Sequence, residues 1–117
     1  MNQFDHEKLN VYQIAIDWVS LAQDIAQALP HGKGNLADQL KRAASSIPLN
    51  IAEGAGEFSG GEKARFYRIA KRSATECAAV LDVANRCSSI SQQHYADGRS
   101  LLLRIVGMLI KLARSHS

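Results

Sequence analysis

The fold is set by one stretch, NLADQLKRAASSIPLNIAEGAGEFSGG, residues 35–61. Apolar side chains recur in it every three or four residues, which is typical of the buried face of a helix. They are Leu36, Leu40, Ala43, Ala44, Ile47 and Ile51. Asn35 stands where an N-cap is expected, and Asp38 places a carboxylate in the first turn. Pro48 removes one backbone donor, yet the apolar spacing continues past it, so the sequence predicts a kinked helix over residues 36–54.

A second, polar stripe runs beside this apolar face. Its members are three or four residues apart and therefore share one side of a helix. They are Gln39, Arg42, Ser46, Asn50 and Glu53. Two interpretations stay open: the stripe is a solvated flank, or it is a polar network pressed against a neighbouring helix.

Three further helices are predicted around this one, over about residues 7–29, 60–88 and 92–114. The short connection at residues 30–34 favours antiparallel neighbours. The chain has only two prolines and long stretches of 3.6-residue periodicity, which argue for helices throughout. The predicted fold class is all-α: an antiparallel up-down-up-down four-helix bundle in a single domain, residues 1–117.

Local signals support the helix over residues 60–88 and the seam of the first helix. Ser59 and Glu62 fit the capping box that begins a helix. The first helix has apolar residues at alternating spacings of four and three, the pattern of bundle packing. They are Val11, Ala15, Trp18, Ala22, Ile25 and Leu29.

The chain carries more apolar helix surface than a lone bundle needs to bury. The helix over residues 60–88 has two adjacent apolar seams, one from Tyr67 to Ala84 and one from Phe66 to Cys87. Between residues 101 and 113 only two cations and one glycine interrupt an apolar run, and this run is too short and too charged to span a membrane. Leu9 and Ile16 fall on the wet side of the first helix and are candidates for a subunit contact. The sequence therefore predicts self-association.

The overall charge is mildly basic, with a net charge of +3 and a pI of about 9.1. This permits nucleic-acid binding without requiring it. The first ten residues, MNQFDHEKLN, lack the apolar segment of a secretory signal. Cys77 and Cys87 are ten residues apart on one predicted helix, about 15 Å along its axis, and cannot bridge each other. We expect a cytoplasmic protein.

No stretch carries a signature of a metal site or a cofactor site. Neither Glu53 nor Glu76 is followed three residues later by a histidine, as in di-iron bundles. No Cys or His spacing matches a zinc site, so no metal and no cofactor are expected. The glycines at residues 60–61 lack the lysine of a phosphate-binding loop, because Glu62 stands in its place.

Polar residues of the second and third predicted helices converge if these helices are antiparallel neighbours. They are Arg42, Asn50, Glu53, Ser73 and Glu76. Two carboxylates brought together could act as acid and base. The favoured interpretation is structural: the group bonds to backbone freed by Pro48 and locks the kink. No catalytic residue is expected.

Basic residues gather on the third predicted helix, where Arg65, Arg68 and Arg72 share one face. With nearby cations they form the candidate nucleic-acid-binding set, which is Lys41, Arg42, Lys63, Arg65, Arg68, Lys71 and Arg72. The alternative is a solvated face held by pairs such as Asp82–Arg86, since no aromatic residues alternate with the cations as in single-strand binders. Assembly into a closed ring would repeat this face and strengthen its field.

Residues 39–54, QLKRAASSIPLNIAEG, are preceded by LNVYQIAIDW and followed by RFYRIAKRSATE over residues 65–76. Together they resemble the four-helix-bundle family encoded in intervening sequences of bacterial large-subunit ribosomal RNA genes. The accessory variability protein of diversity-generating retroelements is a relative. The resemblance implies an antiparallel bundle that assembles as a barrel-shaped homopentamer. The relative implies a basic adaptor that engages a reverse transcriptase and RNA.

Five polar residues also match the motif of that family, namely Arg42, Asn50, Glu53, Ser73 and Glu76. The resemblance assigns no established catalytic role to any of these five residues. The leading hypothesis is a non-enzymatic, homo-oligomeric binding module that engages RNA or a ribonucleoprotein through its basic face. The alternative is a structural or protein-interaction scaffold with no nucleic-acid role.

Overall fold

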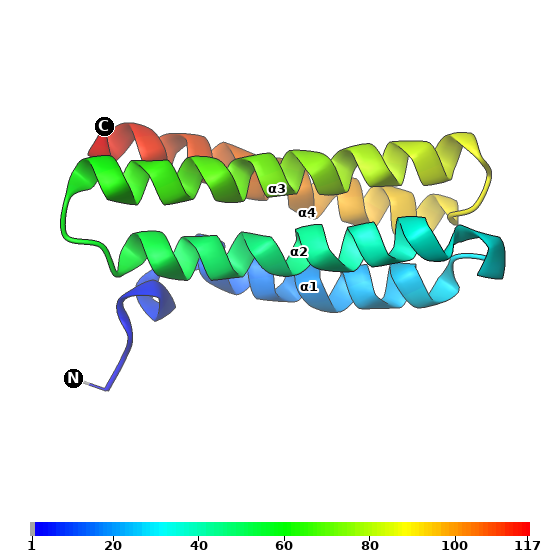
Figure 1. Ribbon diagram of the computed structural model, residues 1–117, viewed down its shortest axis with the longest axis horizontal. Helices are drawn as coiled ribbons and strands as arrows, with labels where there is room; N and C mark the ends of the chain where they lie inside the picture. Colours follow the sequence, from blue (N-terminus) through cyan, green and yellow to red (C-terminus); the bar gives the residue numbers. More distant parts are fainter. Residues whose placement is uncertain (1) are drawn as a thin grey trace.

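The computed structural model describes residues 2–117, which form four long helices lying side by side (Figure 1). These are α1 (Asn10–Ala28), α2 (Gly34–Ala55), α3 (Gly60–Arg86) and α4 (Gln92–His116). Two short 3₁₀ turns, η1 (Asp5–Lys8) and η2 (His31–Lys33), precede α1 and α2. No strand occurs in residues 2–117, so the predicted all-α class is confirmed.

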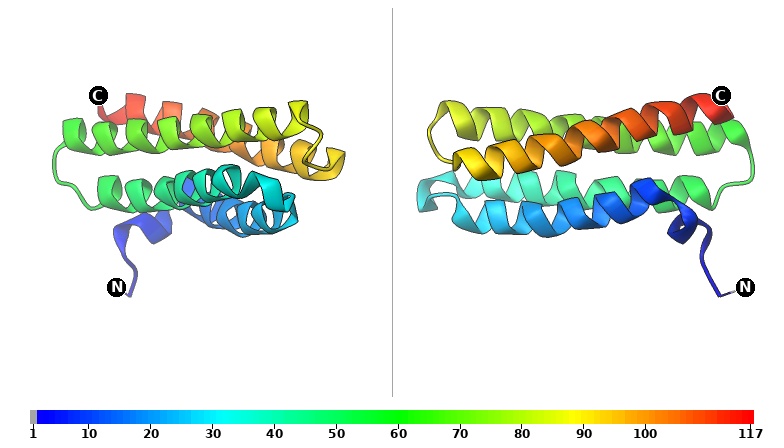
Figure 2. Two further views of the ribbon diagram at one scale, coloured as in Figure 1. Left: turned by 45° about the vertical axis from the view of Figure 1, so that its right-hand side comes forward. Right: turned by 180° about the vertical axis from the view of Figure 1, so that it is seen from behind.

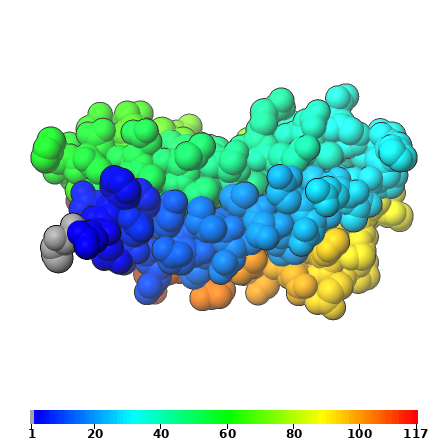
Figure 3. Space-filling model, turned by 90° about the horizontal axis from the view of Figure 1, so that it is seen from below, coloured from blue at the N-terminus to red at the C-terminus, as the bar shows by residue number. Residues whose placement is uncertain are grey.

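Successive helices run in opposite directions along the long axis of the molecule, which measures 44 Å (Figures 1 and 2). α1 and α3 each pack against both α2 and α4. Within the described chain, the pair α1 and α3 and the pair α2 and α4 make no close backbone contact, so they occupy opposite corners of the bundle. Seen from below, α1 lies in front, between α2 and α4 (Figure 3). Each helix therefore keeps one outward face.

The core between the helices is apolar and rich in alanine. On α1 the buried positions follow the predicted seam from Val11 to Ile25. The other helices contribute the large, fully buried side chains Leu40, Ile47, Ile51, Leu81, Leu102, Ile105 and Leu109. Apart from Trp18, Tyr67 and Cys77, no side chain that carries a polar group is buried in the part that the structure describes.

Two glycines allow helices to approach closely. A Cβ at Gly54 would lie 2.8 Å from Cε1 of Tyr67, and one at Gly98 would lie 2.8 Å from Cδ1 of Leu81. Real Cβ atoms do not approach other atoms that closely. Gly54 thus lets Tyr67 of α3 pack directly on the backbone of α2.

The helix starts agree only in part with the sequence signals. Ser59 caps α3, because its Oγ accepts a hydrogen bond from the Glu62 backbone N–H at 3.1 Å. The predicted N-cap at Asn35 is wrong: α2 begins at Gly34, and its N-cap residue, Lys33, makes no side-chain cap hydrogen bond. The reason is that η2 runs straight into α2, with Gly34 already helical at φ −57° and ψ −39°.

α1 begins three residues later than expected, at Asn10, because Leu9 is extended and separates it from η1. α2 continues through Pro48 to Ala55, as its apolar spacing predicts. The kink itself stays a prediction.

Candidate nucleic-acid interface

The positive charge of the chain is concentrated in the first half of α3. Residues 60–75 hold five Lys or Arg and one Glu, a net charge of +4, whereas the whole chain has a net charge of +3. The remaining residues therefore sum to a net charge of −1, with positive and negative stretches that nearly cancel. The first half of α3 is thus the densest run of positive charge in the sequence, although α4 as a whole also has a net charge of +3, with four Lys or Arg against one Asp.

Three arginines of this segment lie on the outward face of α3. Arg65, Arg68 and Arg72 are all exposed, at spacings of three and four residues. Arg65 is partly compensated, because its Nε donates to Oε2 of Glu62 at 2.7 Å. This hydrogen bond raises the pKa of the Arg65 guanidinium. Arg68 and Arg72 form no ion pair with a carboxylate of residues 2–117 and remain free to meet an anion.

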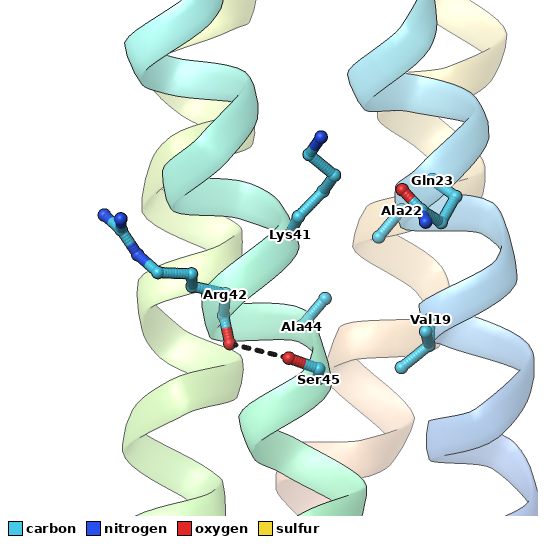
Figure 4. A pocket seen from close by; sticks show the side chains of 7 residues that line it. All are labelled: Val19, Ala22, Gln23, Lys41, Arg42, Ala44 and Ser45. Atoms are coloured by element: carbon cyan, nitrogen blue, oxygen red, sulfur yellow. Dashed lines mark hydrogen bonds between the residues drawn. The ribbon is translucent and has the colours of Figure 1, made fainter.

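The other four cations of the predicted set have separate surroundings. Lys63 Nζ donates to the Ala55 carbonyl at 2.9 Å, so it caps the end of α2. Lys41 leans over the groove between α1 and α2, while its neighbour Arg42 points away from α1 (Figure 4). Lys71 is half-buried, one turn before Thr75 on the flank of α3 that meets α4. The seven predicted residues thus do not share one surface.

The groove in Figure 4 has a volume of about 330 Å³. It is open where small side chains, Ala22 of α1 and Ala44 of α2, face each other. Lys41 and Gln23 are its long polar side chains, and Ser45 Oγ donates to the Arg42 carbonyl at 3.2 Å. Neither an acid–base pair nor a nucleophile with its base is present in this lining.

The polar stripe of α2 joins α3 at a single point. The hydroxyl oxygens of Ser46 and Ser73 are 2.8 Å apart and share a hydrogen bond. Asn50 Nδ2 donates to the Ser46 carbonyl at 2.8 Å and to Ser46 Oγ at 3.0 Å. The side chain of Asn50 therefore bridges the turn that contains Pro48. Of the expected network, Asn50 and Ser73 are brought together through Ser46, which the sequence pattern placed in the stripe but not in the network.

The other three residues of the expected network do not join it. Arg42, Glu53 and Glu76 are exposed and form no side-chain hydrogen bond to residues 2–117. Because α2 and α3 are antiparallel and Ser46 faces Ser73, Glu53 and Glu76 lie about 15 Å apart along the bundle axis. The two carboxylates therefore cannot share a proton, and the acid–base interpretation fails on this register.

One expected ion pair is also replaced. Asp82 does not pair with Arg86; it accepts a hydrogen bond from Tyr95 Oη at 2.8 Å. This bond raises the pKa of Tyr95 and ties α3 to α4. Sequence spacing could not reveal it, because the partners lie on different helices.

The described residues give no sign of a metal centre or a membrane segment. No group of three or more His, Cys, Asp and Glu side chains within residues 2–117 is arranged to hold a metal ion. None of the helices in that range combines the length and hydropathy needed to cross a bilayer.

Comparison with known proteins identifies a family whose sequence model matches this chain. The sequence model described as 23S rRNA-intervening sequence protein matches residues 7–111, nearly the whole bundle. The chain belongs to this family. No curated protein matches the chain. The 23S rRNA-intervening sequence protein family thus accounts for all four helices.

A solved structure has the same fold as this family member. It is the crystal structure of a protein of unknown function from the S23 ribosomal protein family of Bacteroides thetaiotaomicron VPI-5482. The two chains are 20% identical, the match covers 88% of this chain and 97% of the other, and the TM-score is 0.82. This likeness shows the fold alone.

Proposed function

We propose that this member of the 23S rRNA-intervening sequence protein family is a non-enzymatic, self-associating module that binds RNA through the outward face of α3. One observation carries the proposal: residues 60–75 have a net charge of +4, and Arg68 and Arg72 point outward with no carboxylate partner among residues 2–117. A phosphate backbone is the ligand that such a row of guanidinium groups suits best.

The spacing of the arginines supports contacts to successive phosphates. Residues seven apart on a helix are separated by about 10.5 Å along its axis, and residues three or four apart by about 5 Å. Arg65, Arg68 and Arg72 thus offer a linear row of donors. No pocket is needed for this mode of binding, because phosphate contacts give affinity and not base specificity.

Self-association would strengthen RNA binding through multiplicity. Two or three phosphate contacts bind weakly at physiological salt. Large apolar side chains are exposed on the long helices, namely Ile16, Leu49, Val83 and Leu103. An assembly that covers some of them would repeat the arginine row once per copy and raise the avidity for a long RNA.

The test is fluorescence anisotropy with a labelled single-stranded RNA of mixed sequence, titrated at several salt concentrations. The double variant Arg68→Ala/Arg72→Ala removes two phosphate contacts per copy. The slope of log K against log salt is negative, and we expect it to become less steep by about 1.4 for each engaged copy of the variant.

The matched control is Arg104→Ala/Arg114→Ala, which removes two exposed arginines from α4 and changes the net charge equally. It should keep the RNA affinity within about twofold. Equal losses in both variants, or RNA binding that is indifferent to salt, would contradict the proposal. Salt-indifferent binding would favour a protein-interaction scaffold.

A further inference from the structure

An open hollow of about 360 Å³ lies at one end of the bundle. It forms where η1, the α2–α3 connection and the last turns of α4 come together (Figure 1). Lys63 and Tyr67 reach it from α3. The phosphate contacts proposed for Arg65, Arg68 and Arg72 do not use this hollow, because none of the three arginines lines it.

Aromatic side chains form part of its walls. Tyr67 is buried against the backbone of α2 at Gly54, and its ring centroid lies 5.9 Å from that of His116. Phe58, in the α2–α3 connection, lines the hollow and is fully exposed. The hollow thus offers flat apolar surfaces, which suit an occupant that is itself a flat ring.

The charged side chains of the lining cancel, since two are acidic and two are basic. They are Asp5, Glu57, Lys8 and Lys63. A free phosphate would meet two carboxylates here, and a purely apolar side chain would cover charged groups without bonding to them. The lining therefore favours a neutral occupant that carries hydrogen-bond donors and acceptors at its edge.

Tyr67 brings to this site a hydroxyl group that the fold does not use. Its Oη makes no hydrogen bond within residues 2–117, whereas Tyr95 Oη donates to Asp82. It is not sealed off either, because Trp18 Nε1 is the one enclosed side-chain polar atom without a partner in that range. Since Tyr67 lines the hollow, its Oη is open to a ligand there.

The hollow adjoins the arginine row at the start of α3. Lys63 and Tyr67 line the hollow, while Arg65 and Arg68 are exposed on the outward side of the same two turns. A helix with its side chains is about 10–12 Å across, and the glycines at residues 60–61 place no side chain over its start. An RNA strand that follows the row can therefore cross the start of α3 and present its next base to the hollow.

We infer that this hollow holds one unstacked base of the RNA strand whose phosphates follow the arginine row, with Phe58 stacking on the base and Tyr67 Oη bonding to its edge. Proteins recognise single-stranded RNA by these two kinds of contact. The inference rests on the RNA binding in the proposed function and adds a base contact to its phosphate contacts. It restricts the ligand to a single strand, because the bases of a duplex are stacked inside it.

The test is fluorescence anisotropy on the full-length chain with two labelled single-stranded RNAs of equal length. One is unmodified, and the other carries abasic sites, which keep every phosphate but lack the base. The wild type should bind the abasic RNA about tenfold more weakly. Phe58→Ala should weaken binding of the unmodified RNA by a similar factor and should bind the two RNAs almost equally. The salt slope of Phe58→Ala should match that of the wild type, since no phosphate contact is lost.

A second variant and a matched control accompany this pair. Tyr67→Phe removes only the hydroxyl group and should weaken binding of the unmodified RNA about fivefold. It should not lower the free energy of unfolding, because Tyr67 Oη has no partner within residues 2–117. Phe4→Ala removes another aromatic ring, 72% exposed and outside the lining, and should keep the RNA affinity within about twofold. Circular dichroism verifies that each variant is folded.

A wild-type chain that binds neither RNA would overturn the proposed function and this inference together. RNA binding that weakens in Arg68→Ala/Arg72→Ala, yet is equal for the two RNAs and unchanged in Phe58→Ala and Tyr67→Phe, would overturn the inference alone. A nucleoside monophosphate serves as competitor and should displace the RNA only at far higher concentration than unlabelled RNA. Equal competition by both would mean that the hollow takes free nucleotides, and would likewise contradict the inference.

Discussion

At the scale of single residues, the space around a Cα atom and the burial of a side chain decide which changes the fold tolerates. Gly54 faces the Tyr67 ring, while Gly107 on α4 is exposed, and a Cβ added to it would meet no atom within 4 Å. Gly107 lies in the middle of α4 and Gly54 lies one residue before the end of α2. In a helix interior, glycine is the poorer helix former by about 1 kcal/mol relative to alanine. Their surroundings should reverse the sign of the same substitution.

We expect Gly54→Ala to lower the free energy of unfolding by about 1–3 kcal/mol, because the new methyl group must displace a buried ring. Gly107→Ala should raise it by up to about 1 kcal/mol. Urea denaturation followed by circular dichroism measures both. Equal and favourable effects of the two substitutions would show that Tyr67 does not pack on Gly54.

Cys77 is the buried thiol, and it lies near the indole of Trp18. Burial raises the pKa of the Cys77 thiol from 9.0 to about 12. The Trp18 N–H lowers the pKa by a smaller amount. This N–H has no hydrogen-bond partner of good geometry within residues 2–117, so its contact with the sulfur is weak.

The raised pKa predicts a loss of stability at high pH. Between pH 9 and about 12 the unfolded chain releases the Cys77 proton while the folded chain retains it. The free energy of unfolding should therefore fall by up to roughly 1.4 kcal/mol per pH unit in that window, and this thiol should have little effect below about pH 8. Urea denaturation under reducing conditions at pH 8, 9 and 10 measures the slope.

Other groups also titrate at high pH, so the comparison with Cys77→Ala isolates the thiol. Its slope should be shallower than that of the wild type. The exposed Cys87 supplies the matched control, and Cys87→Ala should keep the steep slope. Identical slopes in all three proteins would contradict the assignment.

At the scale of elements, the junction of α2 and α3 depends on three side chains around Ser46. Ser73 reaches it from α3, and Asn50 reaches it from the next turn of α2, past Pro48. A bond network that spans a proline turn and a neighbouring helix can fix both the turn and the register of the two helices.

Ser73→Ala and Asn50→Ala should each lower the free energy of unfolding by about 1 kcal/mol. The double variant should lose less than the sum of the two, because both side chains bond to Ser46. Denaturation of the four proteins completes the cycle. Glu76→Gln should change stability by less than about 0.5 kcal/mol, since Glu76 is exposed and outside the network. A large loss of stability in Glu76→Gln would show instead that the Glu76 side chain belongs to the network around Ser46.

Helix periodicity was sufficient to predict the elements and their buried seams. The amphipathic pattern from Val11 to Ile25 is local, and so is the cap at Ser59, so both could be read from neighbouring residues. The start of α2 was misplaced because η2 has no comparable signal. The contacts of the polar stripe depend on how α2 and α3 are aligned, and no single helix contains that information.

At the scale of the whole molecule, the same limit applies to the candidate interface. Lys41 and Arg42 are adjacent in sequence, yet one leans over the α1–α2 groove and the other points away from α1. Lys63 lies close to the end of α2, and its Nζ donates a hydrogen bond to the Ala55 carbonyl there. Sequence spacing identified the arginine row on α3, since its members share one helix face. It could not show which cations on other elements join that row.

The bundle also separates its charges. The acidic helix α1 and the basic segment at residues 60–75 lie at opposite corners, so the molecule is electrically polarised across its width. The negative side of one polarised molecule attracts the positive side of another. Salt weakens this attraction, because charges further apart than the Debye length, about 10 Å at 0.1 M, are largely screened. Assembly and RNA binding should therefore both respond to ionic strength.

An even number of antiparallel helices brings Asp5 and His116 to the same end of the bundle, where both line one hollow. A fluorescent protein or affinity handle fused at either terminus would project from that end. The opposite end, with η2 and the α3–α4 turn, would stay unobstructed. A circular permutant that links the two termini and is cut between Cys87 and Ser91 would keep all four helices intact.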